Sequence, residues 1–139
     1  MSQENIEVVR DAIAAYNRRD LEALTALNHP DVEMDWSASR GVEAGVYRGW
    51  DEVSRFYQRY FETFEEIIIE PDRFIGFGDS VVVPNHAEVR GRDGINAVAR
   101  SALVFELRNG LIARFCLYQE THEALEAVGL SEQDARTDS

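Results

Sequence analysis

The chain has 139 residues, the size of one domain, and we expect a single domain over residues 1–139 with an ordered core from about 4 to 130. Its net charge of −12, from 26 acidic and 14 basic residues, disfavours nucleic acid and anionic membrane surfaces as partners. A single cysteine excludes an internal disulfide, and the lack of a long apolar stretch or a signal-peptide pattern predicts a cytoplasmic protein with no membrane partner.

The N-terminal part of the chain predicts two helices and a strand. Apolar residues at helical spacing form one stripe of residues 4–18, which includes Tyr16. Asp20 is suited to cap a second, short helix over the sequence LEALTAL. In VEMDW, residues 32–36, apolar and acidic side chains alternate and Trp36 belongs to the apolar face, which is typical of a half-buried strand.

The rest of the chain predicts a long helix followed by strands. A loop rich in Gly, Ser and Ala covers residues 37–49, and residues 50–64 have the apolar spacing of a helix. Strand patterns follow over residues 66–78 (broken at Pro71), 80–91, 97–108 and 111–120. Asn109-Gly110 predicts a hairpin turn between the last two strands, and a short helix is expected after them. This order predicts an α+β fold in which a cone-shaped, curved antiparallel sheet wraps around a long helix, with N-terminal helices beside it. The open end of such a cone is a natural small-molecule pocket.

Alternation in residues 80–91 indicates which side chains face the interior. The odd-numbered positions are apolar except for Asn85, so we expect this row inside the cone. Asn85 then needs a hydrogen-bond partner, which is either neighbouring backbone or a ligand. His86 and Glu88 share the opposite face, where they suit acid–base chemistry or, as we favour, a solvated row or a dimer contact.

The two following strands are harder to orient. In residues 97–108 the inner row contains Ser101 and Leu103, and Arg100 points the other way. Two mixed rows alternate in residues 111–120: Ala113, Phe115, Leu117 and Gln119 in one, and Ile112, Arg114, Cys116, Tyr118 and Glu120 in the other. Periodicity alone does not decide which of these rows faces inward.

Five segments, taken in order, resemble one family. They are YNRRDLEALTAL, HPDVEMDW, VYRGWDEVSRFY, RNGLIARF and THEALEAVGL, and the resemblance spans about residues 4–130. Together they resemble the NTF2-like superfamily and, within it, the SnoaL-like (polyketide-cyclase-like) branch. The resemblance implies the cone fold and an inward row of Ala113, Phe115, Leu117 and Gln119. It does not imply one reaction, because this fold hosts isomerases, cyclases, epoxide hydrolases, dehydratases and binding domains.

The catalytic residues of SnoaL-type polyketide cyclases are not matched. The resemblance implies an acid on the last strand, with a histidine and an amide on the preceding strand, and an ungapped placement puts these groups at Leu117, Leu103 and Ser101. A leucine cannot take a proton, so we expect the architecture without that chemistry. A one-residue bulge would change the register and could bring Tyr118 or Glu120 inward.

The acids of two related kinds of site are expected outside the cone. A ketosteroid-isomerase-like site needs an inward acid, but alternation sends Asp35 to the side opposite Trp36. An epoxide-hydrolase-like relay could take its residue types from Asp35, Arg100 and Glu120, but the assigned phases place all three outside. No metal-ligand spacing links the three histidines, so we expect neither a metal nor a cofactor.

The remaining candidates are mainly aromatic and amide side chains. The aromatic residues should line or cover the cone, and Tyr47 and Trp50 flank a loop that could act as a lid. The predicted ligand-binding residues are Tyr16, Trp36, Tyr47, Tyr57, Asn85, Ser101, Leu103, Leu117 and Gln119. Tyr60 is a further aromatic candidate.

Three functions stay open at this point. The first is a small-molecule-binding domain whose apolar, aromatic-lined pocket takes a small apolar or aromatic molecule. The second is an acid–base enzyme of isomerase, cyclase or hydrolase type that acts on an apolar, ring-containing substrate. The third is a dimeric accessory domain with a vestigial pocket. A homodimer is expected, because the outer face of the sheet mixes apolar and charged residues.

Overall fold

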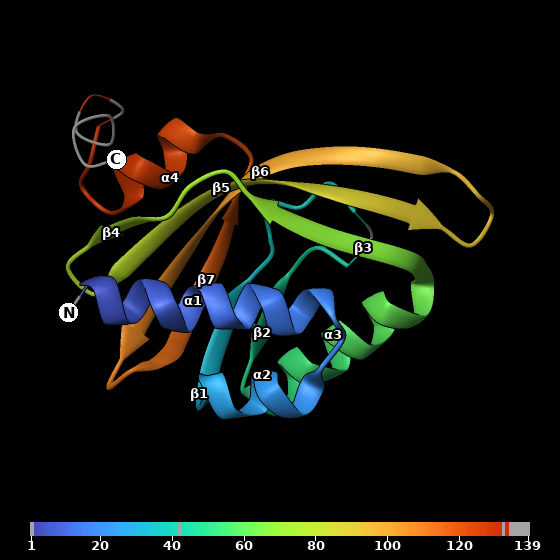
Figure 1. The fold of residues 1–139 in the computed structure, drawn as a ribbon, viewed down its shortest axis with the longest axis horizontal. Helices are drawn as coiled ribbons and strands as arrows, with labels where there is room; N and C mark the ends of the chain where they lie inside the picture. Colours follow the sequence, from blue (N-terminus) through green and yellow to red (C-terminus); the bar gives the residue numbers. More distant parts are fainter. Residues whose placement is uncertain (1, 42, 132, 134–139) are drawn as a thin grey trace.

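The computed structural model describes residues 2–41, 43–131 and 133, and these form an α+β fold (Figure 1). The helices are α1 (Ser2–Asn17), α2 (Leu21–Leu27), α3 (Trp50–Thr63) and α4 (Thr121–Ala127). The strands are β1 (Asn28–Asp35), β2 (Val46–Arg48), β3 (Phe64–Pro71), β4 (Ile75–Phe77), β5 (Ser80–Gly91), β6 (Asn96–Arg108) and β7 (Leu111–Tyr118). The predicted fold class is confirmed.

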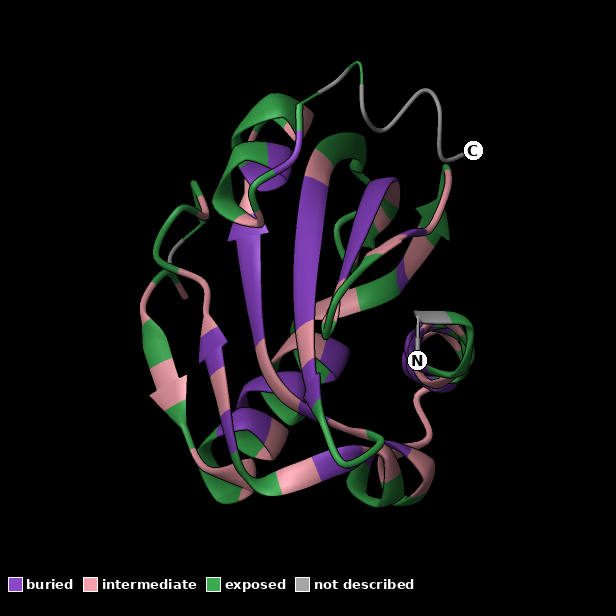
Figure 2. Ribbon diagram, turned by 90° about the vertical axis from the view of Figure 1, so that its left-hand side faces the viewer, coloured by how far each residue is buried: buried purple, intermediate pink, exposed green. Residues whose placement is uncertain are grey.

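The seven strands form one sheet with helices on both faces. The strand order is β2-β1-β7-β6-β5-β3, and β4 pairs with β5 beside β3. The pairs are antiparallel as expected, except that β1 and β7 run parallel. Residues of α1, α2 and α3 pack on one face of the sheet and form the main hydrophobic core with it. Helix α4 packs on the other face, where a second and smaller hydrophobic core lies (Figure 1). Buried residues run along the central strands of the sheet (Figure 2).

Local sequence signals explain the ends of the helices. The carboxylate of Asp20 accepts a hydrogen bond from the Ala23 amide at 3.0 Å, which caps α2 as predicted. Glu120 and Glu123 form a reciprocal capping box at the start of α4. The last predicted strand therefore ends before Glu120, because that residue already belongs to the cap of the following helix.

Two side chains at the corner between α1 and α2 fix the helices to the sheet. Arg19 has a positive φ of 59°, and its guanidinium donates to the carbonyls of Phe61, Phe64 and Glu65 at 2.6, 3.1 and 2.9 Å. Asn17 exchanges two hydrogen bonds, at 2.9 and 2.8 Å, with the backbone of Ile69. These contacts hold α1 against β3 and against the end of α3, which closes one side of the cone.

Several details of the sheet differ from the sequence prediction. The first strand begins at Asn28 rather than at residue 32, and β2 lies inside the predicted loop 37–49. In β7 the register shifts so that Leu107 pairs with Ile112 while Glu106 pairs with Arg114. This bulge leaves Ala113 unpaired between them. The predicted turn at Asn109-Gly110 is present, with positive φ at both residues.

Candidate functional site

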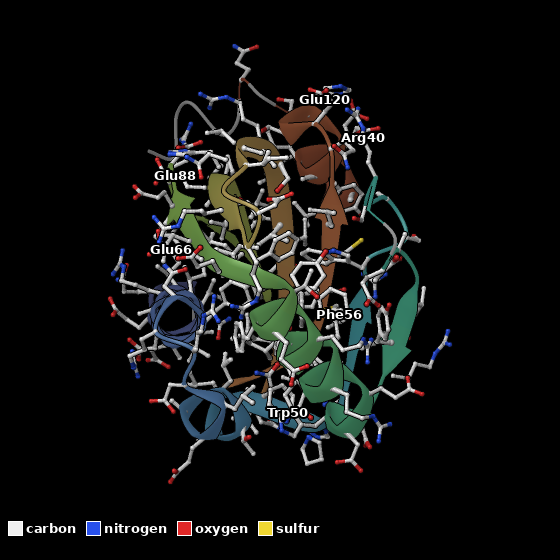
Figure 3. All side chains as sticks on the ribbon, turned by 90° about the vertical axis from the view of Figure 1, so that its right-hand side faces the viewer. Arg40, Trp50, Phe56, Glu66, Glu88 and Glu120 are labelled. Atoms are coloured by element: carbon white, nitrogen blue, oxygen red, sulfur yellow. The ribbon has the colours of Figure 1, made fainter. Side chains whose placement is uncertain are left out.

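The main feature of the structure is a cavity of about 700 Å³ between the three N-terminal helices and the sheet. Side chains of α1, α3, β3, β5, β6 and β7 line it, together with residues 39–41 of the loop after β1. Most of these side chains are apolar, and Phe56 of α3 lies near the middle of the molecule (Figure 3). A concave, mainly apolar space with a few convergent polar groups has the character of a small-molecule site.

Eight of the nine residues predicted to bind a ligand line this cavity. They are Tyr16, Trp36, Tyr57, Asn85, Ser101, Leu103, Leu117 and Gln119. Tyr47 is not among the lining residues: its hydroxyl donates to the Glu43 carbonyl at 2.5 Å, and its ring packs 5.0 Å from that of Phe56. Trp50 does not line the cavity either, and its indole N–H donates a hydrogen bond to the Thr25 hydroxyl at 3.0 Å. The loop therefore reaches the cavity through Ser39 to Gly41 and not through the two aromatic residues that flank its end.

The inward phase of the central strands follows from their register. Leu103 of β6 pairs with Val83 of β5 on one side and with Leu117 of β7 on the other, and all three are buried. Phe115 and Gln119 line the cavity together with Leu117, as the family resemblance implied. The prediction is wrong at the start of β7, where Ile112 lines the cavity and Ala113 does not, because the bulge reverses the alternation there.

The amide of Asn85 is satisfied within the sheet. Its Nδ2 donates to the Val83 carbonyl at 3.0 Å, and its Oδ1 accepts a long hydrogen bond from the Ser101 hydroxyl at 3.4 Å. Of the two alternatives that the sequence left open, the structure shows the backbone hydrogen bond, although the residue also borders the cavity. Gln119 similarly donates to the Ala38 carbonyl at 2.7 Å and so connects β7 to the loop.

Two tyrosine hydroxyls inside the cavity are unpartnered. Tyr16 of α1 and Tyr57 of α3 are only 8% and 9% exposed, and their ring centroids lie 5.5 Å apart in an edge-to-face arrangement. Within the described part of the chain, neither hydroxyl has a hydrogen-bond partner, and neither is enclosed, unlike Oδ1 of Asn28. Burial raises the pKa of both phenols, and their proximity to Tyr60 (for Tyr16) and to Tyr16 (for Tyr57) raises it further. Both therefore remain protonated hydrogen-bond donors at neutral pH.

A second polar group of the cavity lies beside the loop. Burial raises the pKa of the Tyr60 phenol, and the nearby Trp36 and Ser39 side chains oppose this effect only in part. Tyr60 was a sequence candidate because it lies on the apolar face of α3, but nothing in the loop composition pointed to Ser39. The partners of Tyr60 are set by how the loop folds back over α3, which is a tertiary contact without a local pattern.

The acids and the histidine considered for catalysis lie outside the apolar interior. Asp35 is on the outer face, where Ser37 donates to it at 2.6 Å and Arg114 at 3.3 Å. His86 faces Asp72 at 3.1 Å. Glu120 does border the cavity, but it is exposed and its carboxylate accepts the amide hydrogen bond of the α4 capping box. Arg100, which alternation placed outside, and Arg40 of the loop are also lining residues and are exposed, so the rim is charged and the interior is not. Arg40 and Glu120 lie on the same side of this rim (Figure 3).

The outer face of the sheet holds its charges in an ion-pair network. Arg114 contacts Glu33, Asp35 and Glu106 at 3.1, 3.3 and 3.1 Å. Burial lowers the pKa of its guanidinium, but the hydrogen bonds with Glu33 and Glu106 outweigh this effect and raise the pKa. A Ser37 hydrogen bond holds the pKa of Asp35 below its ordinary value, against the effect of burial. These charges satisfy one another and face away from the cavity.

Among the described residues, no group of three or more His, Cys, Asp or Glu side chains is arranged to hold a metal ion. No helix in the same part of the chain is long and apolar enough to cross a membrane.

Comparison with solved structures identifies the architecture as NTF2-like. An NTF2-like protein of unknown function from Burkholderia pseudomallei K96243 is 28% identical, with 91% of this chain and 98% of that chain covered and a TM-score of 0.75. TerC, co-crystallised with polyporic acid, is 25% identical over 90% of this chain and 97% of its own, with a TM-score of 0.75. A third structure is that of a Catenulispora acidiphila DSM 44928 protein with a ketosteroid isomerase-like fold, in complex with trimethylamine. It is 18% identical over 91% of this chain and 95% of its own, with a TM-score of 0.72, and supports the fold alone.

The family follows from a sequence model. The model of the SnoaL-like domain matches residues 9–115, and the chain therefore belongs to the SnoaL-like domain family. A search of curated proteins found no match.

Proposed function

We propose that this SnoaL-like domain binds a small, apolar, ring-containing molecule in the cavity between its helices and its sheet. The observation that carries the proposal is the cavity itself, whose 700 Å³ is bounded mainly by aliphatic and aromatic side chains. Burial of apolar ligand surface against such walls is favourable by roughly 25 cal/mol per Å². The co-crystallisation of the similar TerC with polyporic acid supports a small-molecule role for this type of cavity.

The proposed function does not include proton abstraction by a carboxylate or a histidine inside the cavity. Leu103 and Leu117 occupy the wall positions that the family resemblance assigns to the histidine and the acid, and they are cross-strand partners. General acid–base catalysis needs a titratable group within hydrogen-bond reach of the reacting proton. Among the described lining residues, Glu120 is the carboxylate, and it lies at the rim in a helix cap.

A pair of tryptophan variants tests the binding site. Ala87 lines the cavity on β5 opposite Ala99, whereas the next residue, Glu88, is exposed on the other face. The probe is 2-isopropenylnaphthalene, measured by equilibrium dialysis against the purified chain. We expect saturable binding that Ala87→Trp weakens at least about tenfold, because the indole occupies the cavity, and that Glu88→Trp leaves unchanged. No saturable binding by the wild type, or equal loss in both variants, would refute the proposal.

A further inference from the structure

We infer that the ligand carries a carboxylate beside its apolar ring, and that Arg40 and Arg100 bind this carboxylate at the open end of the cavity. The inference rests on the proposed function and names the chemical class of its ligand: an aromatic carboxylic acid in its ionised form. It is carried by two exposed arginines that border the cavity and contact no acid, backbone carbonyl or ring within the described residues.

The exposed residues of the cavity lining come from three segments, which together we call the mouth. They are Arg40 and Gly41 of the loop after β1, residues 98–100 of β6, and Glu120. The rest of the described lining is buried or half-buried. A ligand therefore meets charged side chains where it enters and mainly apolar ones further in.

The two arginines flank the end of β7 from opposite sides. Strand β6 pairs with β7 only as far as Ala102, so Arg100 lies two residues beyond the last pair, where β6 continues beside β5. On the other side of β7, Gln119 donates to the Ala38 carbonyl at 2.7 Å and holds the loop two residues before Arg40. Because neighbouring strands lie about 4.8 Å apart, the two segments are roughly 10 Å apart, and their long side chains can converge on one carboxylate.

Both arginines are uncommitted in a chain with an excess of acids. The sequence holds 26 acidic and 14 basic residues, and most of the described arginines contact a carboxylate, a backbone carbonyl or an aromatic ring. Glu120 belongs to the same mouth and lies on the same side as Arg40 (Figure 3), but its carboxylate caps α4 and pairs with neither arginine. A carboxylate brought by a ligand would supply the partner that these guanidinium groups lack.

The position of the pair suits a ligand with one charged end. A guanidinium presents a planar fork of donors that matches a carboxylate, and two of them can hold both of its oxygens. Because the arginines are exposed, the carboxylate stays partly in water and loses little hydration, while the ring enters the apolar interior. The net charge of −12 repels anions from the surface as a whole, so local cations are needed to bring such a ligand to the cavity.

The test compares three probes of the same branched, planar shape and different charge. They are 2-naphthoate, the neutral 2-isopropenylnaphthalene and the cation 2-naphthamidinium, and equilibrium dialysis gives their dissociation constants. Relative to the neutral probe, we expect Arg40→Gln and Arg100→Gln each to weaken binding of 2-naphthoate about threefold, and the double variant about tenfold. The same substitutions should leave the relative binding of 2-naphthamidinium unchanged or strengthen it.

Two controls separate the mouth from net charge and from the surface. Arg108 is exposed at the other end of β6, also lacks a partner within the described residues and does not line the cavity. Arg108→Gln makes the same change in net charge and should keep the wild-type ratio of 2-naphthoate to the neutral probe within about twofold. Ala87→Trp, which fills the cavity, should weaken 2-naphthoate as it weakens the neutral probe, because both rings occupy the same space.

Salt provides a second readout that a merely structural role of the arginines would not change. Between about 0.01 M and about 1 M NaCl the Debye length falls from about 30 Å to about 3 Å. In the wild type this should weaken 2-naphthoate relative to the neutral probe. In the double variant it should leave the ratio unchanged or favour 2-naphthoate, because only the repulsion by the acidic chain is left to be screened.

The outcomes distinguish this inference from the proposed function. If the wild type binds the neutral probe but not 2-naphthoate, or if the ratio is unchanged in the double variant, the carboxylate assignment is wrong and the binding site stands. An equal change in Arg108→Gln, or 2-naphthoate binding that Ala87→Trp does not affect, also overturns the assignment. Binding of none of the three probes would overturn the proposed function as well.

Discussion

A carboxylate introduced at Leu117 tests the strand phase on which the site depends. Leu117 is 7% exposed, belongs to the inner row of β7 and pairs with Leu103 of β6. The adjacent Tyr118 belongs to the outer row and packs on the smaller core. If the phase is correct, Leu117→Glu places an acid in the apolar wall and Tyr118→Glu does not. The glutamine variants at the same two positions remove the effects of side-chain shape and leave only those of ionisation.

The magnitude follows from the burial of the site. Desolvation should raise the pKa of the carboxyl group introduced by Leu117→Glu by about 2 units from its unfolded value of about 4.3, and each unit corresponds to about 1.4 kcal/mol. Because the folded pKa is raised, the variant is penalised only when this carboxyl group is ionised. The free energy of unfolding of Leu117→Glu should therefore match that of Leu117→Gln below about pH 4 and fall progressively to about 3 kcal/mol less above about pH 7.

Urea denaturation at intervals from pH 4 to pH 8 measures this difference for both pairs of variants. The Glu-minus-Gln difference at position 118 should change by less than about 1 kcal/mol over the same range, since an outward carboxylate keeps access to water. A flat profile at position 117 combined with a steep one at position 118 would show that β7 presents its other row inward. In that case the leucines would not be the wall of the cavity, and the proposed function would fail with them.

Three further substitutions test the packing and the charges. Arg19→Met should lower the free energy of unfolding in urea by about 2–3 kcal/mol, because three carbonyls of α3 and β3 lose their donor, whereas the exposed neighbour Arg18→Met should change it by under about 0.5 kcal/mol. Phe56→Ala should cost about 3–5 kcal/mol by the same assay, since the ring is 1% exposed and contacts four aromatic side chains. The pKa of Asp35 is lowered, so its carboxylate stabilises the fold above its unfolded pKa, and this stability is lost as pH falls through the folded pKa. Asp35→Asn should therefore be less stable than the wild type at pH 7 and equal to it at low pH. A difference in the free energy of unfolding that stayed constant with pH would contradict this.

How far the sequence predicted the structure depended on how sharply each strand separates its faces. In β5 one row is apolar apart from Asn85, and the interior row was predicted correctly from alternation alone. In β7 both rows are mixed, and the correct phase of Leu117 came from the family resemblance. The bulge at Ala113 could not be predicted, because it accommodates a register set by the tight turn at Asn109-Gly110 and by pairing with β6.

The candidate site shows the same division between local and tertiary information. Tyr16 and Tyr57 were predicted because each lies on the apolar face of a strongly periodic helix, where position alone points the ring inward. Tyr47 was predicted from its neighbourhood in sequence, but its hydroxyl finds Glu43 within the loop, and Ser39 and Arg40 reach the cavity instead. Loop side chains have no periodic constraint, so their direction follows from contacts that form only in the folded chain. The homodimer stays a prediction.

The distribution of hydrogen bonds in the cavity distinguishes residues that build the fold from residues available to a ligand. Asn85, Ser101 and Gln119 are polar lining residues whose amides and hydroxyl already take part in contacts within the chain, and removing them would disturb the sheet or the loop. Tyr16 and Tyr57 are as buried as core residues but leave their hydroxyls uncommitted. A phenylalanine would supply the same packing without an unpaired polar atom, so packing alone does not account for a tyrosine at either position. Tyr16 and Tyr57 belong to different helices and line the same cavity, so its uncommitted polar groups lie on the helices opposite the last strand.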